Sequence, residues 1–256
     1  MDAPLLIETR NLTRHYGSLA AVQDLNLTVP AGELFGFLGP NGAGKSTALR
    51  MLAGVLRPTA GTALVAGHDV QADAMRAKRA TGFMPDEPAV YEQLTGREFL
   101  RFVGGLYGLS DAAIDERAAA LLRLLDLSDK ADDEIRGYSH GMRQKIVLCT
   151  TLLHEPQVLL LDEPLSGLDP HSARRVKETL REFCRRGGAV LLSTHTLEVA
   201  ERLCDRVGIL HQGRLIAEGT MDDLRAQAHG AAGATLEDLF LQLTGGEAWA
   251  EVVRAL

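Results

Sequence analysis

The start of the chain carries the two-residue hydrophobic period of β-strands. Leu25, Leu27 and Val29 alternate with polar residues, which predicts a strand with one buried face. Positions 34–38 form a short apolar run, which is typical of a strand buried on both faces. A glycine-rich loop follows directly, and a helix is expected over 45–53. The order strand, loop, helix opens the predicted core.

The middle of the chain changes to the helical period. Ser110 is a favourable N-cap, and apolar residues recur after it at helical spacing. These residues are Ile114, Ala118, Leu121, Leu122 and Leu125. An acidic stretch at 126–134 ends the region, which we therefore predict to be helical.

The second half alternates between apolar runs and helical patterns. The expected elements are a strand at 158–161, a helix from 169 to about 187, a strand at 189–192, a helix over 197–203, and a hairpin of 207–210 with 214–217. Such alternation predicts a mostly parallel sheet with helices on its faces, and hence an α/β fold. The segment after Gly219 is predicted to be a helical tail, with a break near 230–233.

Composition and charge indicate a globular protein and disfavour several other classes. The chain has 256 residues, 46% hydrophobic and 24% charged, as in a globular domain with a large core. A net charge of −7 disfavours nucleic acid as a partner. The N-terminus lacks a signal-peptide pattern, and no apolar run approaches the roughly 20 residues that cross a bilayer. Any membrane role would therefore require a partner protein.

The cysteines show no paired spacing. Cys149, Cys184 and Cys204 each lie beside apolar residues in a helix-like stretch. We interpret them as reduced core residues of a cytosolic protein, in preference to a redox or metal role.

The glycine-rich loop has the pattern of a phosphate-binding loop. Positions 39–46 read Gly-Pro-Asn-Gly-Ala-Gly-Lys-Ser, which fits G-x-x-x-x-G-K-[ST] between a strand and a helix. Inward-pointing backbone N–H groups and the helix N-terminus would hold the phosphates of ATP. Lys45 is expected to reach the β- and γ-phosphates, and Ser46 to ligate Mg²⁺. The alternative is a glycine-rich turn that matches by chance. The predicted ATP-binding residues of this loop are Gly39, Pro40, Asn41, Gly42, Ala43, Gly44, Lys45, Ser46 and Thr47.

Two adjacent carboxylates end the apolar strand at 158–161. Buried acids are costly unless they have a role, so Asp162 is predicted to hold the Mg²⁺ shell and Glu163 to act as general base toward the attacking water. The alternative is that the two acids have no catalytic role and simply form an acidic turn after a strand.

Further motifs narrow the family. The stretch 138–145, Tyr-Ser-His-Gly-Met-Arg-Gln-Lys, resembles the signature motif of ABC ATPases and lies just before the acidic strand, as in that family. Residues 165–169 resemble the D-loop, and 193–195 the switch-histidine region. Tyr16 is similar to the aromatic residue that stacks on adenine. The resemblance covers about Leu5 to Gly219 and rests on the order and spacing of all these elements.

The resemblance implies a phosphate-loop NTPase core with a mostly parallel sheet, an N-terminal antiparallel β subdomain and a helical subdomain at about 86–155. The nucleotide-binding domain would span 5–219 and the C-terminal tail 220–256. Two ATP molecules would be sandwiched in a head-to-tail dimer with a second copy or a paralogous ATPase subunit. The motor would drive a separate transmembrane permease, and it would be cytoplasmic and peripheral on the inner face of the membrane.

The resemblance also implies a function for each residue that matches a motif of the family. Ser139, His140 and Gly141 would contact the γ-phosphate held by the other subunit, and Asp169 would couple the two sites across the interface. His195 would hold the γ-phosphate and the water in its own subunit. Simpler interpretations remain open: Ser139 as an N-cap, His195 as a structural histidine, and Tyr16 as a core aromatic.

Two positions depart from the family's pattern. In the signature, His140 replaces the first of two glycines and Met142 replaces a glutamine. Asp86 stands where a strand usually ends in a glutamine that touches Mg²⁺ or water. A carboxylate accepts hydrogen bonds but does not donate them, so a metal role and a structural role for Asp86 are equally open.

Two less specific stretches of the sequence indicate the exporter branch of the ABC family. Residues 88–100 and 236–245 resemble that branch, associated with multidrug and small-molecule efflux. An amphipathic helix with Leu236, Leu239, Phe240 and Leu243 either packs on the main domain or makes a regulatory or dimer contact. The leading hypothesis is an ATP-driven exporter motor. The alternatives are a non-transport ABC ATPase acting on ribosomes or nucleic acid, and a catalytically silent nucleotide sensor.

Overall fold

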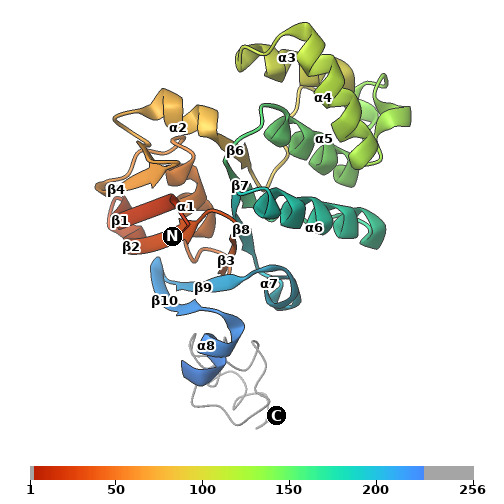
Figure 1. The fold of residues 1–256 in the computed structure, drawn as a ribbon. Coiled ribbons are helices and arrows are strands. Elements are labelled where there is room, and N and C mark those ends of the chain that lie inside the picture. The colour runs from red at the N-terminus through yellow and green to blue at the C-terminus, as the bar shows by residue number, and fades with distance from the viewer. Residues whose placement is uncertain (1–2, 228–256) are drawn as a thin grey trace.

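Two sheets organise the molecule. A computed structural model describes residues 3–227 (Figure 1). The first sheet is antiparallel, has the order β2-β1-β4-β5, and consists of β1 Leu5–Tyr16, β2 Leu19–Pro30, β4 Ala60–Val65 and β5 His68–Asp69. The second has the order β10-β9-β3-β8-β7-β6 and consists of β3 Leu34–Leu38, β6 Thr81–Met84, β7 Val158–Asp162, β8 Ala189–Thr194, β9 Arg206–His211 and β10 Arg214–Gly219. Its strands are parallel except for the β9–β10 hairpin, so the predicted α/β class is confirmed.

Helices cover both faces of the second sheet (Figure 1). The described helices are α1 Lys45–Leu52, α2 Ala74–Ala80, α3 Gly96–Leu106, α4 Asp111–Leu124, α5 His140–Leu153, α6 Pro170–Arg185, α7 Leu197–Leu203 and α8 Met221–Gln227, with short 3₁₀ turns at Ser128–Lys130 and Ile135–Gly137. Helices α3 and α4 lie away from both sheets, at the upper right of Figure 1, and α5 joins them to the second sheet through its contacts with β6. This group falls within the range predicted to be helical.

The run at 34–38 is buried on both sides, as predicted. Phe35 and Phe37 belong to a core shared with the antiparallel sheet and α1. Leu34 and Leu38 point the other way, into a core shared with α5 and α6. Strand alternation therefore divides the interior into two cores separated by one sheet.

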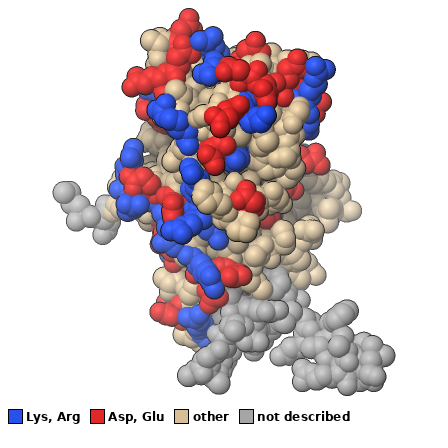
Figure 2. All heavy atoms as spheres, turned by 90° about the vertical axis from the view of Figure 1, so that its right-hand side faces the viewer, with Lys and Arg blue, Asp and Glu red and all other residues tan. Residues whose placement is uncertain are grey.

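Helix α6 shows how the hydrophobic period fixes a face. Val176, Leu180 and Cys184 are buried against the sheet. The outer face carries exposed i,i+4 ion pairs, such as Arg174–Glu178. Where α6 ends, Lys and Arg side chains are interspersed with Asp and Glu on the molecular surface (Figure 2). Exposed pairs of this kind contribute little, roughly 0–1 kcal/mol each.

The cysteines lie in the core, as predicted. All three are free thiols and buried. Burial raises the pKa of the Cys149, Cys184 and Cys204 thiols to about 12, so they carry no nucleophilic thiolate at neutral pH.

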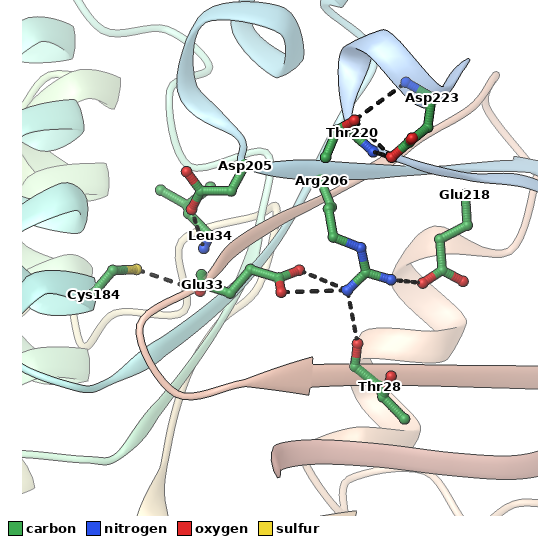
Figure 3. Close-up of polar contacts among 9 residues, drawn as sticks. All are labelled: Thr28, Glu33, Leu34, Cys184, Asp205, Arg206, Glu218, Thr220 and Asp223. Atoms are coloured by element: carbon green, nitrogen blue, oxygen red, sulfur yellow. Dashed lines mark hydrogen bonds and ion pairs between the residues drawn. The ribbon is translucent and has the colours of Figure 1, made fainter. Parts of the chain in front are cut away.

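Arg206 joins the two sheets (Figure 3). Its guanidinium donates from Nη1 to both Glu33 carboxylate oxygens at 3.0 and 3.3 Å, to the Thr28 carbonyl oxygen at 3.3 Å, and from Nη2 to Glu218. It also stacks 5.4 Å from the centroid of the Phe35 ring. Burial raises the pKa of Glu33 and of Glu218, and Arg206 opposes that rise in both cases.

The C-terminal helical prediction is met only in part. Helix α8 begins at Met221, and Leu224 is buried against the core. The predicted break near 230–233 and the amphipathic segment at 236–245 lie outside the described residues.

Candidate functional site

The phosphate loop lies between β3 and α1, and two of its glycines, Gly39 and Gly44, leave no room for a side chain. Gly44 has φ +106°, and a Cβ there would lie 2.3 Å from the carbonyl oxygen of Ala21. A Cβ at Gly39 would lie 2.4 Å from the carbonyl oxygen of Leu210. The loop is therefore wedged against β2 and β9, and larger side chains would push it out of place.

Lys45 crosses the loop that it follows. Its side chain is 7% exposed, and Nζ donates to the carbonyl oxygens of Gly39 at 2.6 Å and Pro40 at 3.1 Å. Burial lowers the pKa of Lys45, while the charges of Glu163, Asp162 and Asp86 oppose that shift. The Lys45 amino group therefore lies among the acidic groups of the site, whose charges favour its protonated form.

One cleft of about 750 Å³ brings most of the predicted residues together. Its lining consists of Tyr16, Leu19, Ala20, Ala21, Asn41, Gly42, Ala43, Gly44, Lys45, Ser46, Thr47, Asp86, Asp162, Glu163 and Gln212. The acids follow the carboxyl ends of the adjacent parallel strands β6 and β7, where open α/β sheets bind ligands. Gly39 and Pro40 are not among the lining residues; both contact Lys45 through their carbonyl groups.

Tyr16 is a rim residue. Its side chain is 47% exposed, which excludes the core interpretation, and the Arg14 guanidinium lies 4.7 Å from the ring centroid. The ring is thus available to a planar ligand at the mouth of the cleft. Its role in stacking on adenine stays a prediction.

Asp162 has one oxygen held and one oxygen without a partner. It is 2% exposed, and Oδ1 accepts a hydrogen bond from Ser193 Oγ at 2.5 Å. Oδ2 is buried and has no hydrogen-bond partner among the described residues. An unpartnered buried carboxylate oxygen is costly, and it is what a Mg²⁺ ion or its bound water would satisfy.

The cation would have to arrive with the nucleotide. Within residues 3–227, no three His, Cys, Asp or Glu side chains gather as a metal site by themselves. Mg²⁺ at phosphate sites usually keeps several waters and is bound through one or two carboxylates plus phosphate oxygens. Asp162 and Asp86 would supply those carboxylates, and the Ser46 hydroxyl would add a further oxygen.

Glu163 and His195 form a pair. The Glu163 Oε1 atom lies 2.9 Å from His195 Nδ1, with the carboxylate 14% exposed and the imidazole 61% exposed. Glu163 adopts φ +49°, a left-handed conformation that is unusual away from glycine. Its N–H points to Ser193, at 3.2 Å from the carbonyl oxygen and 3.1 Å from Oγ. Backbone strain of this kind is found at functional sites.

Asp86 lies where the helical group meets the cleft. It is exposed at the cleft after β6, and its carbonyl oxygen accepts from Gln144 Nε2 at 3.4 Å. Gln144 is 1% exposed and belongs to α5. The position suits a contact with a metal-bound water, and that role stays a prediction.

The signature residues lie outside this cleft. Ser139 caps α5, with Oγ accepting from the Met142 N–H at 3.3 Å. The ring of His140 lies against Gly167, since a Cβ on that glycine would be 2.3 Å from His140 Cδ2. A Cβ on Gly141 would lie 3.1 Å from the Gly167 carbonyl oxygen. Within one chain, the signature therefore packs on the segment that resembles the D-loop.

Asp169 has a structural role within the chain. It is the N-cap of α6, with Oδ1 accepting from the N–H groups of His171 at 2.9 Å and Ser172 at 3.0 Å. Hydrogen bonds, chiefly with Ser172, lower the pKa of Asp169 to about 2. A role across a dimer interface stays a prediction.

Sequence reasoning missed Ser193 and Gln212. Ser193 bonds to the Asp162 carboxylate and to the backbone N–H of Glu163, and Gln212, in the β9–β10 turn, lines the cleft at φ +48°. The sequence placed Ser193 inside a recognised motif but gave no sign of its partners. Nothing in the sequence pointed to Gln212, because the β9–β10 turn approaches the loop only in the folded chain.

This chain is similar to several known proteins. The profile of the family described as "ABC transporter" matches residues 22–166. The probable multidrug ABC transporter ATP-binding protein YbhF of Escherichia coli (strain K12) is 39% identical over 240 residues, 93% of this chain but only 41% of that protein. The linearmycin resistance ATP-binding protein LnrL of Bacillus subtilis (strain 168) is 36% identical over 98% of this chain and 79% of that protein.

A solved structure agrees with these relatives. An ATP-binding subunit of an ABC transporter superposes with a TM-score of 0.87 at 36% identity, covering 93% of this chain and 99% of that one. The likeness therefore includes the whole arrangement of sheets and helices around the cleft.

Proposed function

The chain belongs to the ABC transporter ATP-binding family, and on that basis we propose that it binds and hydrolyses ATP with Mg²⁺ to drive a separate membrane permease. The single observation that carries the proposal is the convergence on one cleft of the phosphate loop, Lys45, Glu163, and Oδ2 of Asp162, which has no partner within residues 3–227. The loop and Lys45 would recognise phosphates, Asp162 the metal, and Glu163 the water.

The phosphate loop and Lys45 bind the nucleotide. Backbone N–H groups of the loop, together with roughly half a positive charge at the N-terminus of α1, attract the phosphate oxygens. Lys45 now donates to loop carbonyl oxygens, and it exchanges these for β- and γ-phosphate oxygens when ATP enters. Tyr16 offers its exposed ring to the adenine.

Glu163 and His195 act on the water and the γ-phosphate. Mg²⁺, held by Ser46 and Asp162 with Asp86 on a bound water, would neutralise charge that develops on the phosphate oxygens. Glu163 accepts the proton of the attacking water. His195 donates from Nδ1 to Glu163 and leaves Nε2 for the γ-phosphate, so one imidazole orients the base and contacts the group that is transferred.

The site is completed by a second ATPase subunit. Ser139 and His140 are exposed and lie outside the cleft of their own chain. A head-to-tail dimer with a second copy or a paralogous subunit brings them, with Gly141, to the γ-phosphate bound by the partner, and places Asp169 at the interface. ATP then stabilises the closed dimer, and hydrolysis removes the contacts that favoured it.

Transport is inferred from the relatives. Both relatives are named as ATP-binding proteins, one of a probable multidrug ABC transporter and one of linearmycin resistance, which favours export of a small molecule. No helix in the described part of the chain is long and apolar enough to cross a membrane. Because the similar solved structure is that of an ATP-binding subunit, we expect the permease to be a separate polypeptide, with this subunit against its cytoplasmic face.

Replacing the general base tests the proposal. Purified wild-type chain, with and without a co-expressed permease, is assayed for phosphate release from ATP and Mg²⁺. Glu163→Gln should still bind ATP, lose turnover by about 10²–10⁴-fold, and accumulate as an ATP-dependent dimer in light scattering. Wild-type turnover in the Glu163→Gln variant would remove Glu163 from its role. A wild-type chain that stays monomeric and inactive, with ATP, Mg²⁺ and permease all present, would refute the function.

A further inference from the structure

Ser193 contacts both acids of the site and has no role in the function as stated so far. It is fully buried near the end of β8, directly opposite Asp162 in the parallel register of β7 and β8. Its hydroxyl donates to Asp162 Oδ1 at 2.5 Å. The same oxygen lies 3.1 Å from the backbone nitrogen of Glu163, which donates to it.

We propose that Ser193 is a positioning residue that prepares Asp162 for the metal ion. Its hydroxyl holds Oδ1, so that the carboxylate plane is fixed and Oδ2 alone is presented to the cation or its water. This inference rests on the proposed function, because it assigns a cause to the metal affinity of that same site.

Burial makes the hydroxyl important. Oδ2 of Asp162 already has no partner in the described part of the chain, and the residue is 2% exposed. Without the Ser193 hydroxyl, Oδ1 would lose its side-chain donor as well. The Asp162 carboxylate could then rotate about its Cβ–Cγ bond. The orientation that a metal needs would become only one of several populated orientations. Removal of an outer-shell partner of this kind typically lowers metal affinity by about 10–100-fold.

The effect on Glu163 should be smaller. The Glu163 N–H is shared between the Ser193 hydroxyl and the Ser193 carbonyl oxygen at 3.2 Å. The carbonyl group remains in any side-chain variant, so the left-handed turn that aims Glu163 at His195 keeps one of its two acceptors. Ser193 therefore acts mainly on the metal and only secondarily on the base.

The test compares nucleotide and metal binding in matched variants. Ser193→Ala removes the hydroxyl, and Ser193→Thr keeps it. Thr151→Val removes another buried hydroxyl, which bonds to Val147 in α5 away from the cleft. The Kd of a fluorescent non-hydrolysable ATP analogue is measured in Mg²⁺ and in EDTA, and Mn²⁺ binding to the analogue-bound chain is measured by electron paramagnetic resonance.

Ser193→Ala should weaken Mn²⁺ binding by about 10–100-fold and erase most of the gain in nucleotide affinity that Mg²⁺ gives. Its Kd in EDTA should match that of the wild type, and so should every value for Thr151→Val. Ser193→Thr should restore metal binding to within about threefold of the wild type. If Ser193→Ala does not fold, Ser193→Cys, a weaker donor of similar size, should give an intermediate loss of metal affinity.

Two results would overturn the proposal. One is Mn²⁺ binding in the folded Ser193→Ala variant that equals that of the wild type. The other is an equal loss of nucleotide affinity in Mg²⁺ and in EDTA, which would show a general distortion of the site. Failure of the proposed function is distinguishable, because the wild type itself would then show no Mg²⁺-dependent ATP hydrolysis.

Discussion

Arg206→Met should destabilise the fold through the junction of the two sheets, and the loss should depend on pH. The variant keeps an unbranched side chain but removes the guanidinium, which bonds Glu33, Glu218 and the Thr28 carbonyl oxygen and lies over the Phe35 ring. The side chains of Arg206, Glu33 and Glu218 are 28%, 11% and 24% exposed. Two largely buried carboxylates would thus lose the cation between them.

The magnitude follows from that burial. Removing one partner of a fully buried pair costs about 3–5 kcal/mol, and residual exposure places this site at the lower end, about 3 kcal/mol. For a chain of this size, 1 kcal/mol shifts Tm by roughly 2–4 °C, so Tm should fall by roughly 6–12 °C. Arg202→Met is the matched control. Its ion pair with Glu198 is 74% and 70% exposed, and its loss should change stability by less than about 1 kcal/mol.

The pH dependence has a definite sign. Burial already raises the pKa of Glu33 and Glu218, and Arg206 opposes the rise, so the variant raises both further. A carboxyl group with a raised folded pKa contributes stability that is present below its unfolded pKa and is lost as pH rises through the folded pKa. The gap between variant and wild type should therefore be larger at pH 7.5 than at pH 5.5.

Urea unfolding followed by circular dichroism at both pH values measures this gap. Adding Glu33→Gln to Arg206→Met should recover part of the loss at pH 7.5, because position 33 then carries no buried charge that needs the guanidinium. Equal destabilisation by Arg206→Met and Arg202→Met, or a gap that widens as pH falls, would refute the electrostatic reasoning.

The remaining predictions concern the cleft. Gly44→Ala places a Cβ 2.3 Å from the Ala21 carbonyl oxygen at φ +106° and should weaken ATP binding by more than tenfold in calorimetry, at a stability cost of roughly 1–3 kcal/mol. The control is Gly105→Ala in α3, where a Cβ meets nothing within 4 Å, and it should be neutral or slightly stabilising. Equal effects of the two variants would contradict the steric argument. Tyr16→Ala should raise the Kd for ATP by roughly 5–150-fold, corresponding to about 1–3 kcal/mol of stacking, and Tyr16→Phe should leave the Kd unchanged. An equally large rise in Kd for Tyr16→Phe would instead implicate the hydroxyl group. Asp86→Ala should raise the Mg²⁺ concentration for half-maximal turnover several-fold. Asp86→Gln can still accept a hydrogen bond from a metal-bound water and should stay near the wild type. No change in Asp86→Ala would assign the residue a structural role.

The local features of this protein follow from short stretches of its sequence. The loop at 39–46 is specified by glycines that allow close backbone approach, and the strand at 158–161 by a continuous apolar run; both are where the periodicity predicts them. The acids at 162 and 163 follow because a strand end is a local property. The caps at Ser110 and Asp169 are local too, since a side chain and the N–H groups it accepts from are only two or three residues apart.

Which distant groups meet depends on how whole strands pack. The order β9-β3-β8-β7-β6 is not the order in the sequence, and it places the loop after β3 at the same edge of the sheet as the ends of β7 and β6, with β8 between β3 and β7. The register that sets Asp162 opposite Ser193, and the turn that brings Gln212 to the cleft, depend on the packing of whole strands. The exposure of Tyr16 and the contact of His140 with Gly167 likewise depend on how separate elements pack. These contacts join residues far apart in the chain, and no periodicity or propensity of a single segment encodes them.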